Sequence, residues 1–84
     1  MYKVESDDEA GHQVAALPED ALVAYASLID LIALHPWSGE PLRGTDSTSP
    51  MRTHTFGHNG TGLAIYLILE DQQRVVVLRV LWAG

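Results

Sequence analysis

The sequence predicts an α+β domain in which two N-terminal helices pack on an antiparallel sheet, in the order β-α-α-β-β-β. Apolar residues recur at helical spacing in the first half of the chain, whereas nearly continuous apolar runs of strand length fill its end. A segment rich in Gly, Ser, Thr and Pro separates the two halves. Because 84 residues suffice for only one hydrophobic core, a single domain over residues 1–84 is expected.

The N-terminal residues are expected to form a short strand and then a short helix. Residues 1–5 alternate weakly between polar and apolar types. The sequence Ser6-Asp7-Asp8-Glu9 matches a capping box, with Ser6 capping a helix over residues 7–17. Acids in the first turn favour the positive end of that helix. Pro18 closes the helix and suits the first position of the next one.

Residues 18–34 form the most strongly predicted helix. Its inward face is expected to carry Leu22, Tyr25, Ala26, Ile29, Ile32 and Ala33. The opposite face carries polar residues together with Val23, Leu31 and Leu34. Such a helix is either buried on more than one side by its own domain, or it leaves an apolar strip for a partner to cover.

The second half of the chain is expected to form a three-stranded antiparallel unit. His35-Pro36 ends the helix, and residues 37–50 are predicted to be a loop. Strands are predicted over residues 51–56, 63–70 and 74–82, joined by a glycine-rich turn at 57–62 and a short turn at 71–73. The last two strands form a hairpin.

Charge and composition exclude several classes of function. The net charge is −6, and the whole chain holds only five Lys and Arg residues. Because nucleic-acid affinity depends on clustered cations, strong binding to mRNA or the ribosome is disfavoured. The chain has no cysteine, which excludes disulfides and thiolate metal sites. No apolar stretch is long enough to cross a bilayer, so a cytoplasmic protein without a membrane partner is expected. No cofactor is expected either.

Four segments resemble the RelE/ParE toxin superfamily in their order and spacing. They are ALPEDA (16–21), LHPWSGEPLRG (34–44), MRTHTFG (51–57) and LAIYLILEDQQRVVVLRVLW (63–82). The resemblance implies the toxin component of a bacterial toxin–antitoxin pair, neutralised by an antitoxin protein that wraps its surface. RelE-like members of this superfamily cleave mRNA in the ribosomal A site, and ParE-like members act on DNA gyrase.

The resemblance extends to individual residues only in part. Leu42, Gly44, Arg52 and Tyr66 match the family pattern, but Leu63 lies where the RelE nucleases place an arginine. Those nucleases are also typically basic. The resemblance therefore implies a RelE-type mRNA endonuclease fold with weak or lost catalysis. The alternative is a non-enzymatic interaction module, or a ParE-like inhibitor of a protein target, that acts through an apolar surface.

The candidate catalytic residues are Arg52, His54, Tyr66 and Arg79. Cleavage of RNA by its own 2′-hydroxyl needs a base, an acid and cations that stabilise the phosphorane. Arg52 and His54 share a strand face, and Tyr66 lies opposite Arg79 if the hairpin has a two-residue loop, but opposite Leu78 if the loop has three. A nuclease would gather all four residues in one concave face of positive potential. Otherwise Arg52 and His54 are the solvated half of an exposed strand.

Arg79 raises a separate question, because it is the only charge in the apolar run of residues 75–82. A guanidinium in such a strand either marks a concave polar site or points outward at a sheet edge.

The apolar surface is expected to bind a partner, and no metal site is expected. Partner-binding residues on the apolar surface are Val23, Leu31, Leu34 and Trp82, and the partner is either an antitoxin protein or a second copy in a homodimer. No metal site is expected, because His54 and His58 lie on a strand and in a glycine turn, where positions four apart do not share a face.

Overall fold

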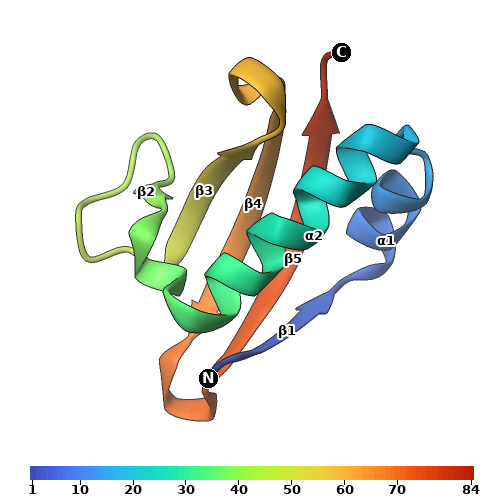
Figure 1. Ribbon diagram of the computed structural model, residues 1–84. Helices are drawn as coiled ribbons and strands as arrows, with labels where there is room; N and C mark the ends of the chain where they lie inside the picture. The colour runs from blue at the N-terminus through green and yellow to red at the C-terminus, as the bar shows by residue number, and fades with distance from the viewer.

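The computed structural model describes residues 1–84 and contains one five-stranded mixed sheet, ordered β1-β5-β4-β3-β2 (Figure 1). The α2 helix crosses one face of this sheet diagonally, and α1 lies beside the outer edge of β5. The elements are β1 (Lys3–Ser6), α1 (Asp8–Ala15), α2 (Glu19–Leu34), η1 (Pro36–Ser38), β2 (Glu40–Pro41), β3 (Met51–Phe56), η2 (His58–Gly60), β4 (Gly62–Leu69), η3 (Glu70–Gln72) and β5 (Arg74–Trp82).

The predicted α+β fold with two helices on a sheet is confirmed, and two details of the sheet differ. Its strands are not all antiparallel, because β1 pairs in parallel with β5. A parallel neighbour needs a long crossover, which the helices and three intervening strands supply. The predicted loop over residues 37–50 also contains β2, a two-residue edge strand that pairs with β3 and ends in Pro41. Proline is compatible with an edge strand, since it donates no ladder hydrogen bond.

The first helix begins one residue later than predicted. Ser6 does not cap it, because Ser6 belongs to β1 and pairs with Val77. The cap is Asp7, whose carboxylate accepts a hydrogen bond from the amide of Ala10 at 2.9 Å. Pro18 likewise precedes α2 as its N-cap rather than starting it.

The inward face of α2 contains Tyr25 and Ile32 as predicted, but its centre is shifted toward Ala21 and Leu28. Ala21, Tyr25, Leu28 and Ile32 are the buried residues, at helical spacing, whereas Leu22 is exposed. The face away from the sheet exposes the apolar residues Val23 and Leu34, and Leu31 is exposed on the adjacent flank that faces the end of β3. None of the helices has the length and apolar character needed to cross a membrane.

The core lies between α2 and the facing side of β3, β4 and β5. Phe56 connects the two layers, with its ring 5.5 Å from that of Tyr25 in an edge-to-face contact and 5.9 Å from that of Trp82 in a stack. Gly62 faces Phe56 across the strand pair, and a Cβ there would lie 2.4 Å from the ring. The β4 and β5 strands contribute Ala64, Tyr66, Ile68, Val75, Val77 and Val80.

A β-bulge interrupts the pairing of β4 with β5. Ile65 lies opposite Arg79 and Tyr66 opposite Val77, so Leu78 is the extra residue on β5. Neither of the two predicted partners of Tyr66 is therefore correct, because the connection runs from Glu70 to Gln73, with Gln73 in the left-handed conformation. Before the bulge the odd-numbered residues of β5 face the core, and after it Val80 does.

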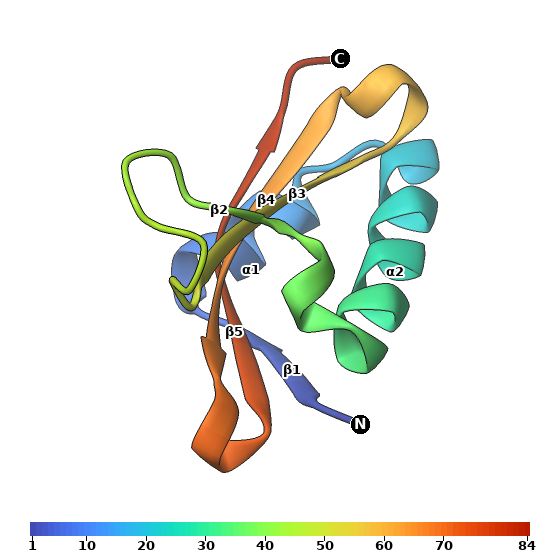
Figure 2. The same ribbon diagram turned by 90° about the vertical axis from the view of Figure 1, so that its left-hand side faces the viewer.

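The second face of the sheet has no helix over it, and the loop between β2 and β3 projects from that side (Figure 2). We call it the open face. Register and burial assign to it Met51, Thr53 and Thr55 of β3, Leu63, Ile65, Leu67 and Leu69 of β4, and Arg74, Val76, Leu78, Arg79 and Leu81 of β5.

Candidate functional site

Arg52 is a buried structural residue that organises the segment between β2 and β3. Its side chain is only 7% exposed. The guanidinium donates to the main-chain carbonyls of Gly39 at 3.0 Å, Ser47 at 2.6 Å and Ser49 at 3.0 Å. It also lies over the ring of Trp37, at 4.9 Å from the centroid. Each of its three guanidinium nitrogens therefore donates one hydrogen bond to the main chain of the domain itself.

Tyr66 is also enclosed on the helix-facing side of the sheet. Its hydroxyl donates to the carbonyl of Pro36 at 2.6 Å, which attaches η1 to β4. Burial raises the pKa of the Tyr66 phenol, so it stays protonated at neutral pH. Gly39 packs against this hydroxyl, where a Cβ would lie 2.2 Å from it. Tyr66 therefore fixes the start of β2 and does not face solvent.

His54 is the only one of the four candidates that borders a groove. It lies opposite Ala64 on the helix-facing side of β3, and its Nδ1 is 2.8 Å from the carbonyl oxygen of Thr55. His54 and Thr55 line two adjacent depressions, one facing α2 and the other at the β2 side of the strand. Neither depression contains Arg52, Tyr66 or Arg79.

Arg79 lies on the open face, away from the other three candidates. The bulge at Leu78 puts it there, because without the extra residue Arg79 would have the same orientation as the buried Val77. Its guanidinium pairs with Glu9 of α1 at 2.9 Å, and both side chains are more than half exposed. The structure therefore distributes Arg52, His54 and Tyr66 on one side of the sheet and Arg79 on the other.

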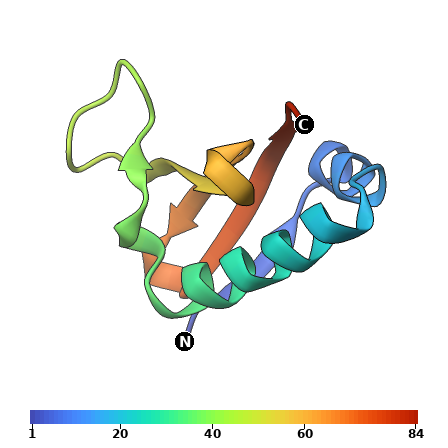
Figure 3. The same ribbon diagram turned by 45° about the horizontal axis from the view of Figure 1, so that its top comes forward.

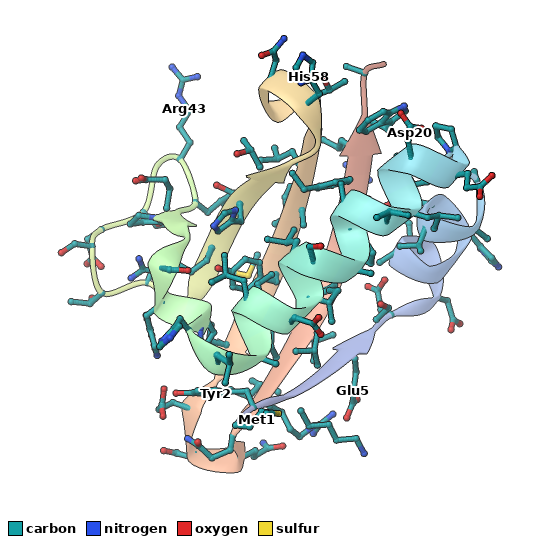
Figure 4. The ribbon with its side chains drawn as sticks, in the orientation of Figure 1. Met1, Tyr2, Glu5, Asp20, Arg43 and His58 are labelled. Atoms are coloured by element: carbon teal, nitrogen blue, oxygen red, sulfur yellow. The ribbon has the colours of Figure 1, made fainter.

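The open face is apolar and lacks an unpaired cation. Eight of its side chains are Met, Leu, Ile or Val: Met51, Leu63, Ile65, Leu67, Leu69, Val76, Leu78 and Leu81. Its two arginines are each paired with an acid, Arg74 with Glu5 at 2.9 Å and Arg79 with Glu9. Figure 4 shows Glu5 at the β1 edge of the sheet and Arg43 at the tip of the β2–β3 loop, pointing away from the domain.

Comparison with known proteins gives matches in structure but not in sequence. No protein-family model matches the chain, and no curated protein matches it significantly. A chain of the intact RelBE toxin–antitoxin complex from E. coli has a TM-score of 0.82 at 16% identity, covering 100% of this chain and 99% of that one. The isolated E. coli RelE toxin has a TM-score of 0.82 at 15% identity, covering 100% and 86%. A chain of the RelBE2 complex from Mycobacterium tuberculosis has a TM-score of 0.71 at 24% identity, covering 96% of each.

The chain has the RelE toxin fold. The predicted resemblance is thereby confirmed for the fold, over the whole of the chain. A fold is a scaffold on which several functions are built, so the chemistry of this RelE fold depends on its own side chains.

The predicted partner-binding residues lie in two different environments on this RelE fold. Val23 and Leu34 are 66% and 56% exposed on the outer side of α2, and Leu31 is exposed beside them. Trp82 is half-buried, stacks on Phe56 and packs against the core, so it does not extend the α2 strip. The role of these residues in binding stays a prediction.

Two side chains that organise the fold carry no local sequence signal. The side-chain oxygen of Gln13 accepts the main-chain amide of Val80 at 2.6 Å, beyond the point where β1 ends. Glu70 accepts hydrogen bonds from Tyr2, Trp37 and Gln73, each at about 2.7 Å. Their partners lie at least 33 residues away or across a turn, and only the folded chain brings them together. No cluster of three His, Asp or Glu side chains suited to a metal ion is present.

Proposed function

We propose that this chain is the toxin-type component of a toxin–antitoxin pair, and that it acts by binding protein rather than by cleaving mRNA. Support for the first part comes from the RelE fold, since the similar chains belong to RelE and RelBE toxin–antitoxin structures. The expected partners are an antitoxin and a protein target. The ribosome and mRNA are less suited to a chain with a net charge of −6.

The apolar open face is the observation that carries the second part. A contiguous apolar surface on a small protein is typical of a site of protein contact. An RNA-cleaving site would need free cations to stabilise a phosphorane, whereas Arg74 and Arg79 on this face are engaged by Glu5 and Glu9. Arg52 is enclosed by its own loop. The exposed strip of Val23, Leu31 and Leu34 on α2 is a second surface of the same apolar kind.

The second candidate function is residual ribosome-dependent mRNA cleavage. It is favoured by the fold and by His54, which borders a groove, and by Arg79, whose exposed ion pair with Glu9 is weak enough to open. In that case the catalytic set would be Arg52, His54, Tyr66 and Arg79, and at least Arg79 would have to act separately from the rest.

Inducible expression in a bacterial host, with and without the neighbouring open reading frame, tests the proposal. Growth arrest that the neighbour relieves is the expected result. Ile65→Lys introduces a charge into the centre of the open face and is expected to abolish the arrest. His54→Ala and Arg79→Ala are expected to leave it intact.

A control variant and an mRNA assay distinguish the two functions. Asp71→Lys also introduces a lysine, but on the exposed turn between β4 and β5, outside the open face, and should arrest growth like the natural chain. Arrest that is lost in His54→Ala or Arg79→Ala, together with mRNA cut within ribosome-bound codons, would establish the nuclease instead. Absence of any arrest would overturn the toxin proposal.

A further inference from the structure

We propose that the unpaired half of β3 binds an extended, apolar-and-basic segment of a partner polypeptide as an added strand. The site is the edge at His54–Phe56, together with the two depressions that flank it. The inference does not depend on the toxin function, because it concerns the edge of the sheet and not the open face. We call this site the β3 edge groove.

The main-chain amide of Thr55 is directed away from the sheet, whereas its carbonyl oxygen already lies 2.8 Å from Nδ1 of His54. The amide of Ile68 donates to the carbonyl of Pro50, so the even-numbered residues of β3 bond to β4. Met51, Thr53 and Thr55 then present their main-chain groups to the other side, where the amide of Leu42 donates to Met51.

The strand that would cover this edge is too short to reach Thr55. The ladder between β2 and β3 consists of Pro41 opposite Arg52 and Glu40 opposite Thr53, and the chain before Glu40 turns away into η1. Gly39, packed against the Thr53 carbonyl and the Tyr66 hydroxyl, fixes this turning point. The amide of Thr55 therefore has no strand beside it, which is the condition for addition of a strand from another chain.

The two depressions match the alternation of side chains along an added strand. The first lies between α2 and the end of β3, has a volume of about 570 Å³, and is lined on the helix side by Ala24, Ser27, Leu28 and Leu31. The second lies on the β2 side, measures about 180 Å³, and is lined by Ser38, Gly39, Glu40, Thr53 and Leu63. Both include His54 and Thr55. Successive residues of a strand point to opposite faces, so neighbouring residues would enter the apolar and the polar depression in turn.

Charge selects the kind of segment. Glu40 is exposed and takes part in none of the ion pairs of the chain. The exposed acids of α2, Glu19, Asp20 and Asp30, line neither depression, so Glu40 is the acid that a bound segment would meet. Figure 3 shows α2 along one side of the sheet, with β2 and β3 beyond its C-terminal half. A lysine or arginine in the polar depression would meet Glu40, and an apolar side chain in the other would meet Leu31.

A second copy of this chain is a poorer occupant than a basic segment. Pairing of two β3 edges would bring together two molecules that each carry a charge of −6, with Glu40 at both edges. A helix in the groove would leave the Thr55 amide without a strand partner, so the geometry favours an extended segment.

The test uses blocked hexapeptides in which Val, Leu or Phe alternates with Lys or Arg, added to the isotope-labelled full chain. The expected result is saturable binding, with the largest amide shifts at His54, Thr55 and Phe56 and slowed hydrogen exchange of the Thr55 amide. Peptides of the same composition, with all apolar residues placed before all basic ones, should bind at least about tenfold more weakly because they cannot fill both depressions in turn.

Three substitutions separate strand addition from general attraction to an acidic protein. Thr55→Pro removes the outward amide without removing a bond to β4, and should weaken binding about tenfold or more. Glu40→Lys should weaken it about fivefold, whereas Asp71→Lys changes the net charge equally on a distant turn and should weaken it less than about twofold.

The proposal is overturned if no alternating peptide binds at millimolar concentration. It is also overturned if the shifts fall on the open face, or if Glu40→Lys and Asp71→Lys weaken binding equally. Should Thr55→Pro fail to fold, the comparison of Glu40→Lys with Asp71→Lys decides the question alone. Because no growth assay is involved, failure here leaves the toxin proposal untouched, and the converse also holds.

Discussion

Arg52 holds the segment of residues 39–50 against β3 through three hydrogen bonds to main-chain carbonyls. The strand period correctly places Arg52 and His54 on one face, and the same face contains Tyr66. Whether that face is solvated depends on the segment of residues 39–50, which has no periodicity. Because Arg52 bonds to carbonyls of that segment, its guanidinium is enclosed by the domain itself.

Arg79, unlike Arg52, lies at the surface of the sheet, where it pairs with Glu9. The sequence reduces the question to an inward polar site or an outward position, and the structure shows the outward position. The deciding feature is one extra residue in β5, which no local pattern reveals.

Replacing Arg52 is expected to destabilise the protein strongly. Arg52→Ala removes charged donors from three carbonyls and a contact with Trp37, and should lower the free energy of unfolding by roughly 2–4 kcal/mol. Arg52→Lys should recover less than half of this, since an ammonium lacks the planar set of donors. Urea unfolding followed by tryptophan fluorescence measures both values. Arg43→Ala, at an exposed loop residue, is the control and should change stability by less than about 0.5 kcal/mol. An equal loss in the two alanine variants would contradict the structural role.

At the scale of elements, the edge of β5 is completed by two different kinds of structure. The first half of β5 pairs with β1, and the second half lies beside α1. A helix has no free main-chain acceptor for a strand, so the side chain of Gln13 supplies one to the amide of Val80. The sequence predicts both α1 and β5, but their contact joins residues 67 positions apart and leaves no local signal.

Loss of the Gln13 side chain should expose the Val80 amide to exchange. Gln13→Ala leaves a part-buried donor without its acceptor, and is expected to reduce stability by about 1–2 kcal/mol. Gln13→Glu keeps an oxygen acceptor for Val80 but places a second carboxylate beside Glu9, so it should recover only part of the lost stability. Hydrogen exchange resolved by residue should show faster exchange at Val80 in the alanine variant alone. His12→Ala, on the same helix, serves as the control, and unchanged protection of Val80 in Gln13→Ala would refute the bond.

For the whole molecule, Glu70 joins the N-terminus, η1 and the hairpin turn. Tyr2 donates to it at 2.7 Å and 2.8 Å, Trp37 at 2.7 Å and Gln73 at 2.7 Å. Figure 4 shows Tyr2 close to the turn between β4 and β5. Hydrogen bonds from Tyr2, then Trp37 and Gln73, hold the pKa of Glu70 below its usual value. The ionised carboxylate is therefore the form that stabilises the fold.

The contribution of Glu70 is expected to depend on pH. Because its pKa is lower in the folded state than in the unfolded state, the stabilisation is complete above the unfolded pKa of about 4.3 and declines as the pH falls through the folded value. Glu70→Gln should thus be less stable than the natural chain at neutral pH, and the difference should shrink near pH 3. Urea unfolding of the natural chain and of Glu70→Gln at both pH values measures this difference in the free energy of unfolding. Asp71→Asn, at a neighbouring side chain without a hydrogen bond or ion pair, should show no such trend. A constant loss for Glu70→Gln at both pH values would exclude the mechanism.

The parts of the molecule that the sequence predicts well are those encoded by local periodicity. The strand over Met51–Phe56 agrees with its predicted bounds, and the long helix and the final hairpin agree closely with theirs. The two-residue β2 and the parallel pairing of β1 depend on contacts between distant segments. The candidate catalytic residues fall between these cases, because their strands are predictable but their relative placement depends on the hairpin connection and the bulge.

The bulge at Leu78 has a consequence for tracing the ancestry of this chain. Positions of β5 upstream of it face the interior when odd-numbered, and those downstream do so when even-numbered. A relative without the extra residue would align correctly only if a gap were opened at Leu78. Without that gap, the outward arginine of one protein would be matched to an interior valine of the other. Identities calculated over this strand would then understate the true kinship.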